Sequence, residues 1–122
     1  MNEINDKLTP QELIISLFGL SQQKRLVYSQ MEIHNFLYSK KIQRINPFTD
    51  LEFKWDGPYP ICSEIQKAYN NLRIIGLLEM DIPLLTHITT KDCRDYFNRN
   101  IRGRLSNKKL AELEQIAREF SE

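Results

Sequence analysis

Apolar residues recur at helical spacing along much of the chain. The segment Thr9–Glu12 predicts a helix start, because a hydroxyl cap, a proline in the first turn and a glutamate at the third position form a capping box. Leu13, Leu17 and Leu20 mark the apolar side of this helix. The longest helical pattern covers residues 22–41, where two neighbouring apolar stripes leave few positions for solvent. So wide an apolar arc predicts a central helix that packs on two sides.

A half-buried strand is predicted over Leu51–Trp55, because apolar and polar side chains alternate there. The same stretch contains an Asp-x-Glu-x-Lys pattern, formed by Asp50, Glu52 and Lys54. Metal-dependent nucleases use such carboxylates to hold Mg²⁺ and a lysine to stabilise developing charge. Their aspartate normally comes from an earlier strand, and no strand is predicted before this one. We therefore expect an edge strand with outward charges and no enzymatic activity.

The second half of the chain predicts a helix, a hairpin and two further helices. Ser63–Gln66 has the pattern of a capping box, and the helix over 63–75 buries Ile65, Ala68, Tyr69, Leu72 and Ile75 and ends at Gly76. Residues 77–82 and 84–89 predict two short strands around Pro83. Thr90 predicts the cap of a helix over 91–98, and Ser106 predicts the cap of a last helix.

Short sequence motifs around these elements resemble a known family. Gly57-Pro58-Tyr59 is followed by Ile65, Leu72 and Gly76-Leu77-Leu78, and Gln23–Tyr28 is similar to the opening of that family's long helix. Over residues 21–90 the chain thus resembles small prokaryotic winged-helix proteins of the YwgA-like group and archaeal winged helix-turn-helix regulators. The chain departs from the family pattern at Pro60, because the family usually has a small hydroxyl residue directly after the aromatic residue of this motif.

The resemblance implies an α+β fold, a winged helix-turn-helix with additional C-terminal helices. The length of 122 residues predicts a single domain over 1–122, with a winged-helix core at about 9–90 and a helical extension at about 91–122.

In a helix-turn-helix, the second helix enters the major groove of DNA. The predicted helix over 63–75 carries polar side chains on its outward side, and Asn, Gln and Arg side chains pair with base edges. The candidate DNA-binding residues on this helix are Ser63, Gln66, Lys67, Asn70, Asn71 and Arg73. Alternatively, these residues form the solvated polar face of an amphipathic helix and bind no DNA. Ile74 lies on the same stripe, which suggests contact with another helix or a partner.

Charge is unevenly distributed, although the 122 residues sum to only +1, from 17 Lys and Arg against 16 Asp and Glu. Residues 93–109 hold six basic residues and one acidic residue, whereas 110–122 hold four acidic residues and one basic residue. The loop-like run Asn98–Arg104 contributes Arg99, Arg102 and Arg104 as candidate phosphate contacts. Alternatively, these arginines pair with glutamates of the last helix. The predicted wing carries Glu79 and Asp81 and no Lys or Arg, and this acidic wing does not suit a minor-groove contact.

Other chemistry is not indicated. Cys62, Cys93, His34 and His87 lack the spacing of a zinc site, so we expect no metal and no cofactor. We expect His34 to be a core histidine and both cysteines to be buried thiols. The polar N-terminus and the lack of a long apolar run predict a cytoplasmic protein.

The sequence therefore predicts a DNA-binding winged-helix protein, a transcription regulator that acts on double-stranded DNA as a homodimer. The predicted dimer contact is the apolar face of the last helix, Leu110, Leu113, Ile116, Ala117 and Phe120. Alternatively, that face closes the core of the monomer. The competing function is a protein-interaction module of the antitoxin or adaptor kind, which the acidic wing, the small net charge and Ile74 favour.

Overall fold

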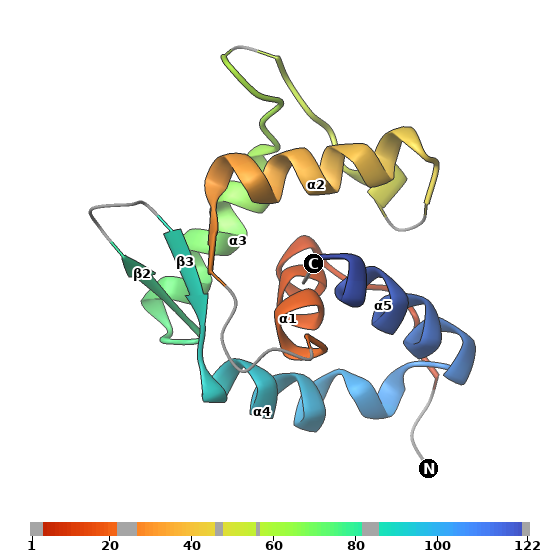
Figure 1. Ribbon diagram of the computed structural model, residues 1–122. Helices are drawn as coiled ribbons and strands as arrows, with labels where there is room; N and C mark the ends of the chain where they lie inside the picture. Colours follow the sequence, from red (N-terminus) through yellow and green to blue (C-terminus); the bar gives the residue numbers. More distant parts are fainter. Residues whose placement is uncertain (1–3, 22–26, 46–47, 56, 82–85, 121–122) are drawn as a thin grey trace.

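The computed structural model describes residues 4–21, 27–45, 48–55, 57–81 and 86–120, which form a small, mostly helical domain (Figure 1). The α-helices of this part are α1 (Pro10–Gly19), α2 (Gln30–Ile42), α3 (Ser63–Ile74), α4 (Lys91–Asn100) and α5 (Asn107–Phe120). Its strands are β1 (Val27–Ser29), β2 (Leu78–Asp81) and β3 (Thr86–Thr89). Two short 3-10 helices are η1 (Phe48–Asp50) and η2 (Arg102–Arg104). Within these residues, no helix combines the length and the apolarity needed to cross a bilayer.

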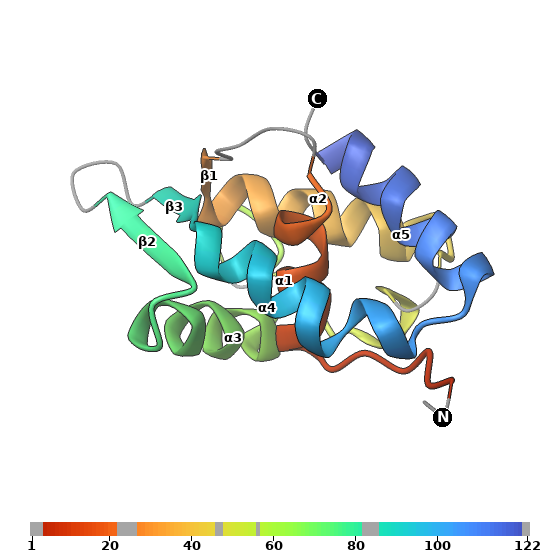
Figure 2. The same ribbon diagram turned by 90° about the horizontal axis from the view of Figure 1, so that it is seen from below.

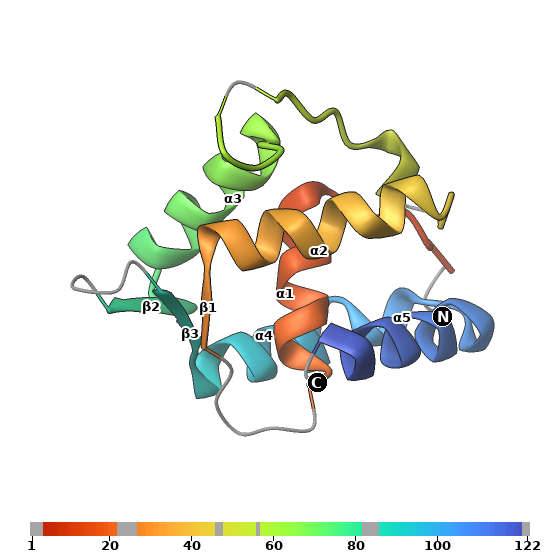
Figure 3. The same ribbon diagram turned by 45° about the horizontal axis from the view of Figure 1, so that its top comes forward.

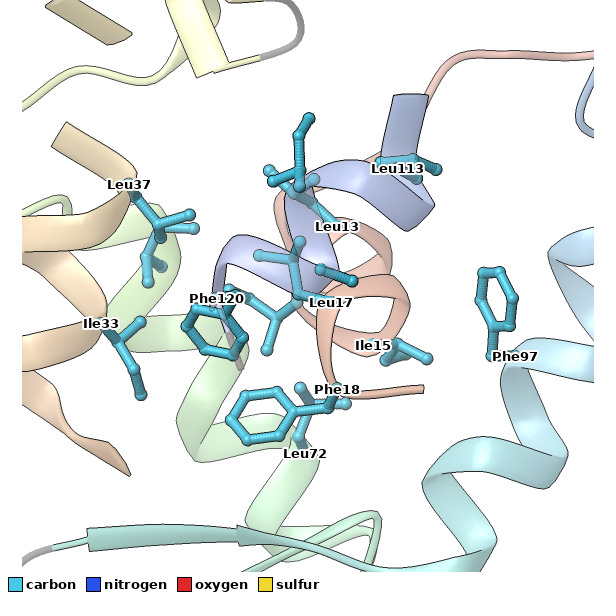
Figure 4. Packing of buried hydrophobic residues seen from close by; sticks show 14 of the residues in the cluster. Leu13, Ile15, Leu17, Phe18, Ile33, Leu37, Leu72, Phe97, Leu113 and Phe120 are labelled. Atoms are coloured by element: carbon cyan, nitrogen blue, oxygen red, sulfur yellow. The ribbon is translucent and has the colours of Figure 1, made fainter. Parts of the chain in front are cut away.

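Helix α1 is the centre of the core. Its predicted capping box is confirmed, since the Thr9 hydroxyl accepts from the Glu12 backbone N–H and the Glu12 carboxylate accepts from the Thr9 N–H. All residues from Leu13 to Phe18 are buried. Helices α3, α4 and α5 all contact α1, and Figure 4 shows their apolar side chains converging on it. The central helix is therefore α1, and the prediction of a central helix over 22–41 is wrong.

The segment predicted as one long helix divides into a strand and a helix. Strand β1 ends at Ser29, whose hydroxyl caps α2 in a reciprocal capping box with Glu32. The backbone before Ser29 pairs with β3 instead of continuing the helix. Met31 is exposed, so the apolar arc of α2 is narrower than predicted. Residues 22–26, including Leu26 of the predicted stripe, lie outside the described residues.

The sheet has three antiparallel strands in the order β1-β3-β2. The predicted hairpin is confirmed for β2 and β3, which pair with Leu78 opposite Thr89 and Asp81 opposite Thr86. The predicted strand residues Ile82, Leu84 and Leu85 lie outside the described residues. The hairpin lies at one end of the molecule, and the junction of α4 with α5 lies at the other (Figures 1 and 2).

The predicted strand over Leu51–Trp55 is wrong. This stretch belongs to the long connection that returns from the end of α2 to the start of α3 (Figure 3). It makes a single antiparallel bridge, between Lys54 and Ile61, with backbone N···O distances of 2.8 and 2.9 Å. Leu51 is buried and Phe53 packs partly buried against the core, while Glu52 and Lys54 are exposed, as an alternating pattern requires. The alternation fails only at Trp55, which is 61% exposed. An alternating pattern forms a strand only where a neighbouring strand is present to pair with it.

Helix α3 begins at Ser63, but the predicted capping box is wrong. Its N-cap is Cys62, which makes no side-chain cap hydrogen bond. Ile65, Ala68, Tyr69 and Leu72 are buried as predicted, whereas Ile75 is 56% exposed. The helix ends one residue earlier than predicted, and Gly76 follows with a φ of +83°. Because this conformation is strained for L-residues, glycine is the natural residue to end α3 there.

The C-terminal helices begin at the predicted residues. The Thr90 hydroxyl caps α4 by accepting from the Cys93 N–H, and the Ser106 hydroxyl accepts from the Lys109 N–H at the start of α5. The run Asn98–Arg104 is not a loop, because it comprises the last turn of α4 and η2.

The apolar face of α5 is not available as a dimer contact. Leu113, Ile116, Ala117 and Phe120 are buried, and Leu110 packs at the edge of the same core. The face therefore closes the core of the monomer, and the predicted homodimer contact through it is wrong.

An ion pair ties α5 to α2 and makes stability depend on pH. The Lys40 ammonium, which is largely buried and lies 5.3 Å from the Phe36 ring centroid, donates to the Glu119 carboxylate. This hydrogen bond holds the pKa of Glu119 below its ordinary value of 4.5. Because the pKa is lower in the folded than in the unfolded state, the pair stabilises the fold above pH 4.5 and this contribution is lost as the pH falls through the folded-state pKa.

We expect Glu119→Gln to weaken the dependence of the urea midpoint on pH in the acid range and to leave its slope near neutral pH unchanged. Asp6 retains some acid dependence in that variant, because the N–H and hydroxyl of Ser106 lower the pKa of Asp6. Urea unfolding followed by circular dichroism at a series of pH values measures both effects. An unchanged pH profile in Glu119→Gln would contradict this role of the pair.

Candidate recognition surface on helix α3

The outward face of α3 is a polar stripe that ends in an apolar residue. Ser63, Lys67, Asn70 and Ile74 recur at helical spacing and are all exposed. Ile74 is 76% exposed, more than any other large apolar residue described in the chain. The sequence-based expectation that Ile74 shares the outward stripe is therefore confirmed.

The predicted DNA-binding residues of α3 differ in accessibility. Ser63, Lys67, Asn70, Asn71 and Arg73 are exposed, and Gln66 is half-buried. Asn71 turns toward α1, because its side-chain amide donates to the side-chain oxygen Oε1 of Gln11 at 3.4 Å. Ser63, Lys67 and Asn70 are thus the predicted residues that share the exposed stripe of Ile74.

A hollow of about 600 Å³ separates α3 from the start of α1 and from α4. Ile15 and Ala68 are the buried residues among its lining, and the half-exposed ring of Tyr96 on α4 contributes as well. Its charged lining residues are Glu12, Glu64 and Lys67. Glu12 belongs to α1 and pairs with Arg104, so α3 itself brings one carboxylate and one ammonium to this hollow, with no excess of positive charge.

A smaller hollow of about 200 Å³ lies beside the first turn of α3. It is lined by Glu52, Lys54, Ile61, Ser63 and Glu64. Carboxylates again outnumber cations, and the positive potential that draws a helix to phosphate is not built here.

The arginines predicted to contact phosphate do not join α3. Arg99 is exposed on α4. The Arg102 Nε donates to the Asn98 side-chain oxygen at 3.0 Å, and its guanidinium carbon lies 5.5 Å from the Phe97 ring centroid. Arg102 lines a hollow formed with Gly19–Ser21 and α5, to which no α3 residue contributes.

Arg104 is occupied by contacts within the chain. One Nη pairs with a Glu12 carboxylate oxygen at 3.0 Å and donates to the Lys7 carbonyl at 2.7 Å. Arg104 is thus paired, but with Glu12 of α1, so the predicted alternative of a pairing with the glutamates of the last helix is wrong for this residue. The free positive charge expected near 99–104 is reduced accordingly.

His34 and the two cysteines belong to the interior. His34 is fully buried, with a ring nitrogen 3.4 Å from the Cys62 carbonyl oxygen and its ring 5.9 Å from that of Tyr59. Cys62 and Cys93 are buried free thiols, as predicted. Within the described part of the chain, no group of three or more His, Cys, Asp or Glu residues is placed to hold a metal ion.

Three residues of this surface were not predicted from the sequence. Gln11 and Tyr96 line the larger hollow, and Ile75 extends the exposed apolar end of α3. The pair Ile74-Ile75 next to Gly76 was a usable signal for Ile75, since a helix that ends there leaves no turn to cover its last side chains.

The chain matches no family model, no curated protein and no solved structure. The function proposed below therefore follows from the geometry of α3 and its neighbours.

Proposed function

We propose that this chain is a winged-helix domain that binds another protein through the exposed end of α3. The element order α1-β1-α2-α3-β2-β3 and the sheet order β1-β3-β2 support the winged-helix assignment. The hairpin follows α3 after three residues, as a wing follows a recognition helix. The helices α4 and α5 then pack on α1 as an addition to that core.

The observation that carries the choice of partner is the exposed pair Ile74 and Ile75. Their side chains are 76% and 56% exposed at adjacent positions of the same helix end. Covering a large aliphatic side chain releases about 1.5–3 kcal/mol, so two such neighbours form an anchor for a protein partner. Neither hollow beside α3 has an excess of positive charge in its lining, which suits a protein better than a polyanion.

Three forms of the full chain test this proposal: the wild type, Ile74→Asp and Ile42→Asp. Ile42 is a matched control, because it is 62% exposed at the end of α2, on a different helix. Because both side chains are mostly exposed, we expect neither substitution to disturb the core. We expect affinity capture followed by quantitative mass spectrometry to recover one stoichiometric partner with the wild type and with Ile42→Asp. We expect Ile74→Asp to weaken the affinity for this partner about tenfold or more, which corresponds to a loss of about 1.4 kcal/mol of binding free energy. Capture of the same proteins by all three forms would contradict the proposal.

The second candidate function is sequence-specific binding of double-stranded DNA by α3. It is favoured by the exposed side chains of Lys67, Asn70, Asn71 and Arg73, which have the hydrogen-bonding groups that read base edges. Fluorescence anisotropy with a pool of duplexes at low salt distinguishes the two functions. A DNA-binding domain binds with an affinity that falls steeply with salt, and Lys67→Ala reduces the salt slope by about one. Absence of duplex binding at low salt would exclude this candidate.

A further inference from the structure

A separate hollow of about 350 Å³ lies between the C-terminal end of α1, η2 and α5. Its lining residues are Gly19, Leu20, Ser21, Arg102, Glu114 and Arg118. Two guanidinium groups from different elements thus line one hollow, together with the largely buried residue Ser21. None of the α3 residues discussed above contributes to it.

Two contacts within the chain orient the Arg102 side chain and leave part of its guanidinium group available as a hydrogen-bond donor. Its Nε is bound to the Asn98 side chain, and its guanidinium lies over the Phe97 ring. The two Nη groups make no hydrogen bond with any residue that the structure describes. An oriented guanidinium with two free Nη groups matches the geometry of a carboxylate or phosphate.

Arg118 supplies a second positive charge from α5. Its one hydrogen bond to a described residue is a long contact of 3.4 Å from Nη1 to the Gln115 side chain. Glu114 also lines the hollow, one helical turn before Arg118. In the described part of the chain, the ion pairs are Lys40–Glu119, Arg104–Glu12 and Lys109–Glu112, so none of the three charges of this hollow is paired.

We infer that this hollow is a binding site for the phosphate group of a small molecule. Two arginines against one glutamate leave an excess of one positive charge in a small polar hollow, and charge-assisted hydrogen bonds from guanidinium to phosphate are the strong ones. The volume of about 350 Å³ lies near the lower end for ligand pockets and exceeds the size of a bare ion, so it fits a phosphate ester. Because the site is separate from α3, it is independent of the proposed protein contact.

The probes that test this site are inorganic phosphate and glycerol 3-phosphate, compared with chloride at equal ionic strength. A ligand that binds only the folded state raises the unfolding temperature in a saturable way. We expect this rise in the wild type and in Arg99→Gln, a control on the exposed face of neighbouring α4. We expect Arg102→Gln or Arg118→Gln to weaken binding about tenfold or more, as loss of a charged hydrogen bond does. Glu114→Gln removes the one repelling charge, and we expect it to tighten binding.

Proton–nitrogen correlation NMR spectra provide the second readout. We expect saturable chemical-shift changes at the backbone amides of Gly19 and Ser21 when either probe is added. Phosphate also stabilises proteins without binding, by exclusion from their surface. An equal rise in unfolding temperature in all variants would therefore overturn the inference, as would the absence of saturable shifts in the wild type with both probes. Saturable binding of either probe that needs both arginines supports it, and the tighter probe distinguishes free phosphate from a phosphate ester.

Discussion

Replacing Phe120 by alanine is expected to lower the free energy of unfolding by about 3–5 kcal/mol. Phe120 ends the described part of α5, yet it is 1% exposed. Its ring contacts Phe18 of α1 edge-on at 5.4 Å between centroids and Phe36 of α2 at 5.0 Å. The substitution removes the side chain that joins these three helices and leaves a cavity between them. Urea unfolding at neutral pH measures the loss.

The control for Phe120 is Gln115→Ala on the exposed side of the same helix, for which we expect a change within about 0.5 kcal/mol. Phe120→Ala also tests whether the apolar face of α5 packs within one chain or forms a dimer contact. If α5 completes the core of one chain, sedimentation equilibrium gives the same mass for Phe120→Ala and the wild type at temperatures where both are folded. A Phe120→Ala variant of unchanged stability and altered mass would contradict the structure.

Replacing Gly19 by alanine is expected to destabilise the fold by about 1–3 kcal/mol, although alanine favours helices. A Cβ added at Gly19 would lie 2.8 Å from the Phe97 Cβ, which is too close for any real contact. The clash is costly because it involves the root of the Phe97 side chain, so α1 and α4 must move apart. Thermal and urea unfolding of the variant measure this effect.

The chain offers two matched glycine variants for comparison. At Gly57 nothing lies within 4 Å of an added Cβ, so we expect Gly57→Ala to leave stability nearly unchanged. At Gly76 the space is also open, but the φ of +83° makes any side chain strained, and we expect Gly76→Ala to destabilise by about 1–2 kcal/mol. If all three variants behaved alike, the close approach of α1 and α4 at Gly19 would be refuted.

Local signals in the sequence predicted the helix starts well. Thr9, Thr90 and Ser106 all cap the helices expected of them, because a cap hydrogen bond joins residues only three positions apart. Ser29 and Glu32 form a capping box of the same local kind. It was not predicted, because the apolar pattern continues through the residues before Ser29 and makes β1 and α2 look like one helix. The Ser63 box failed, since Cys62 already occupies the cap position.

The candidate recognition surface was predicted in part. The polar stripe of α3 and the exposure of Ile74 follow from the helical period, once the buried stripe is known. The positions of the basic residues in space do not follow from the helical period. Arg104 pairs with Glu12, which lies 92 positions earlier in the chain, and this distance in sequence leaves no pattern by which the contact is predictable.

The sequence by itself determined where α1, α4 and α5 begin, which side of α3 is buried and that a hairpin follows Gly76. These features depend on hydrogen bonds and periodicities within a few residues. The tertiary structure alone decided three others. Residues 27–29 became a strand because β3 is present to pair with them, whereas 51–55 found only a single bridge. The α5 face turned inward because Phe18 and Phe36 receive Phe120. Arg102 and Arg118 came to line one hollow because η2 and α5 both pack near the end of α1. Such contacts join residues far apart in sequence, so they depend on the packing of the whole chain and not on any local pattern.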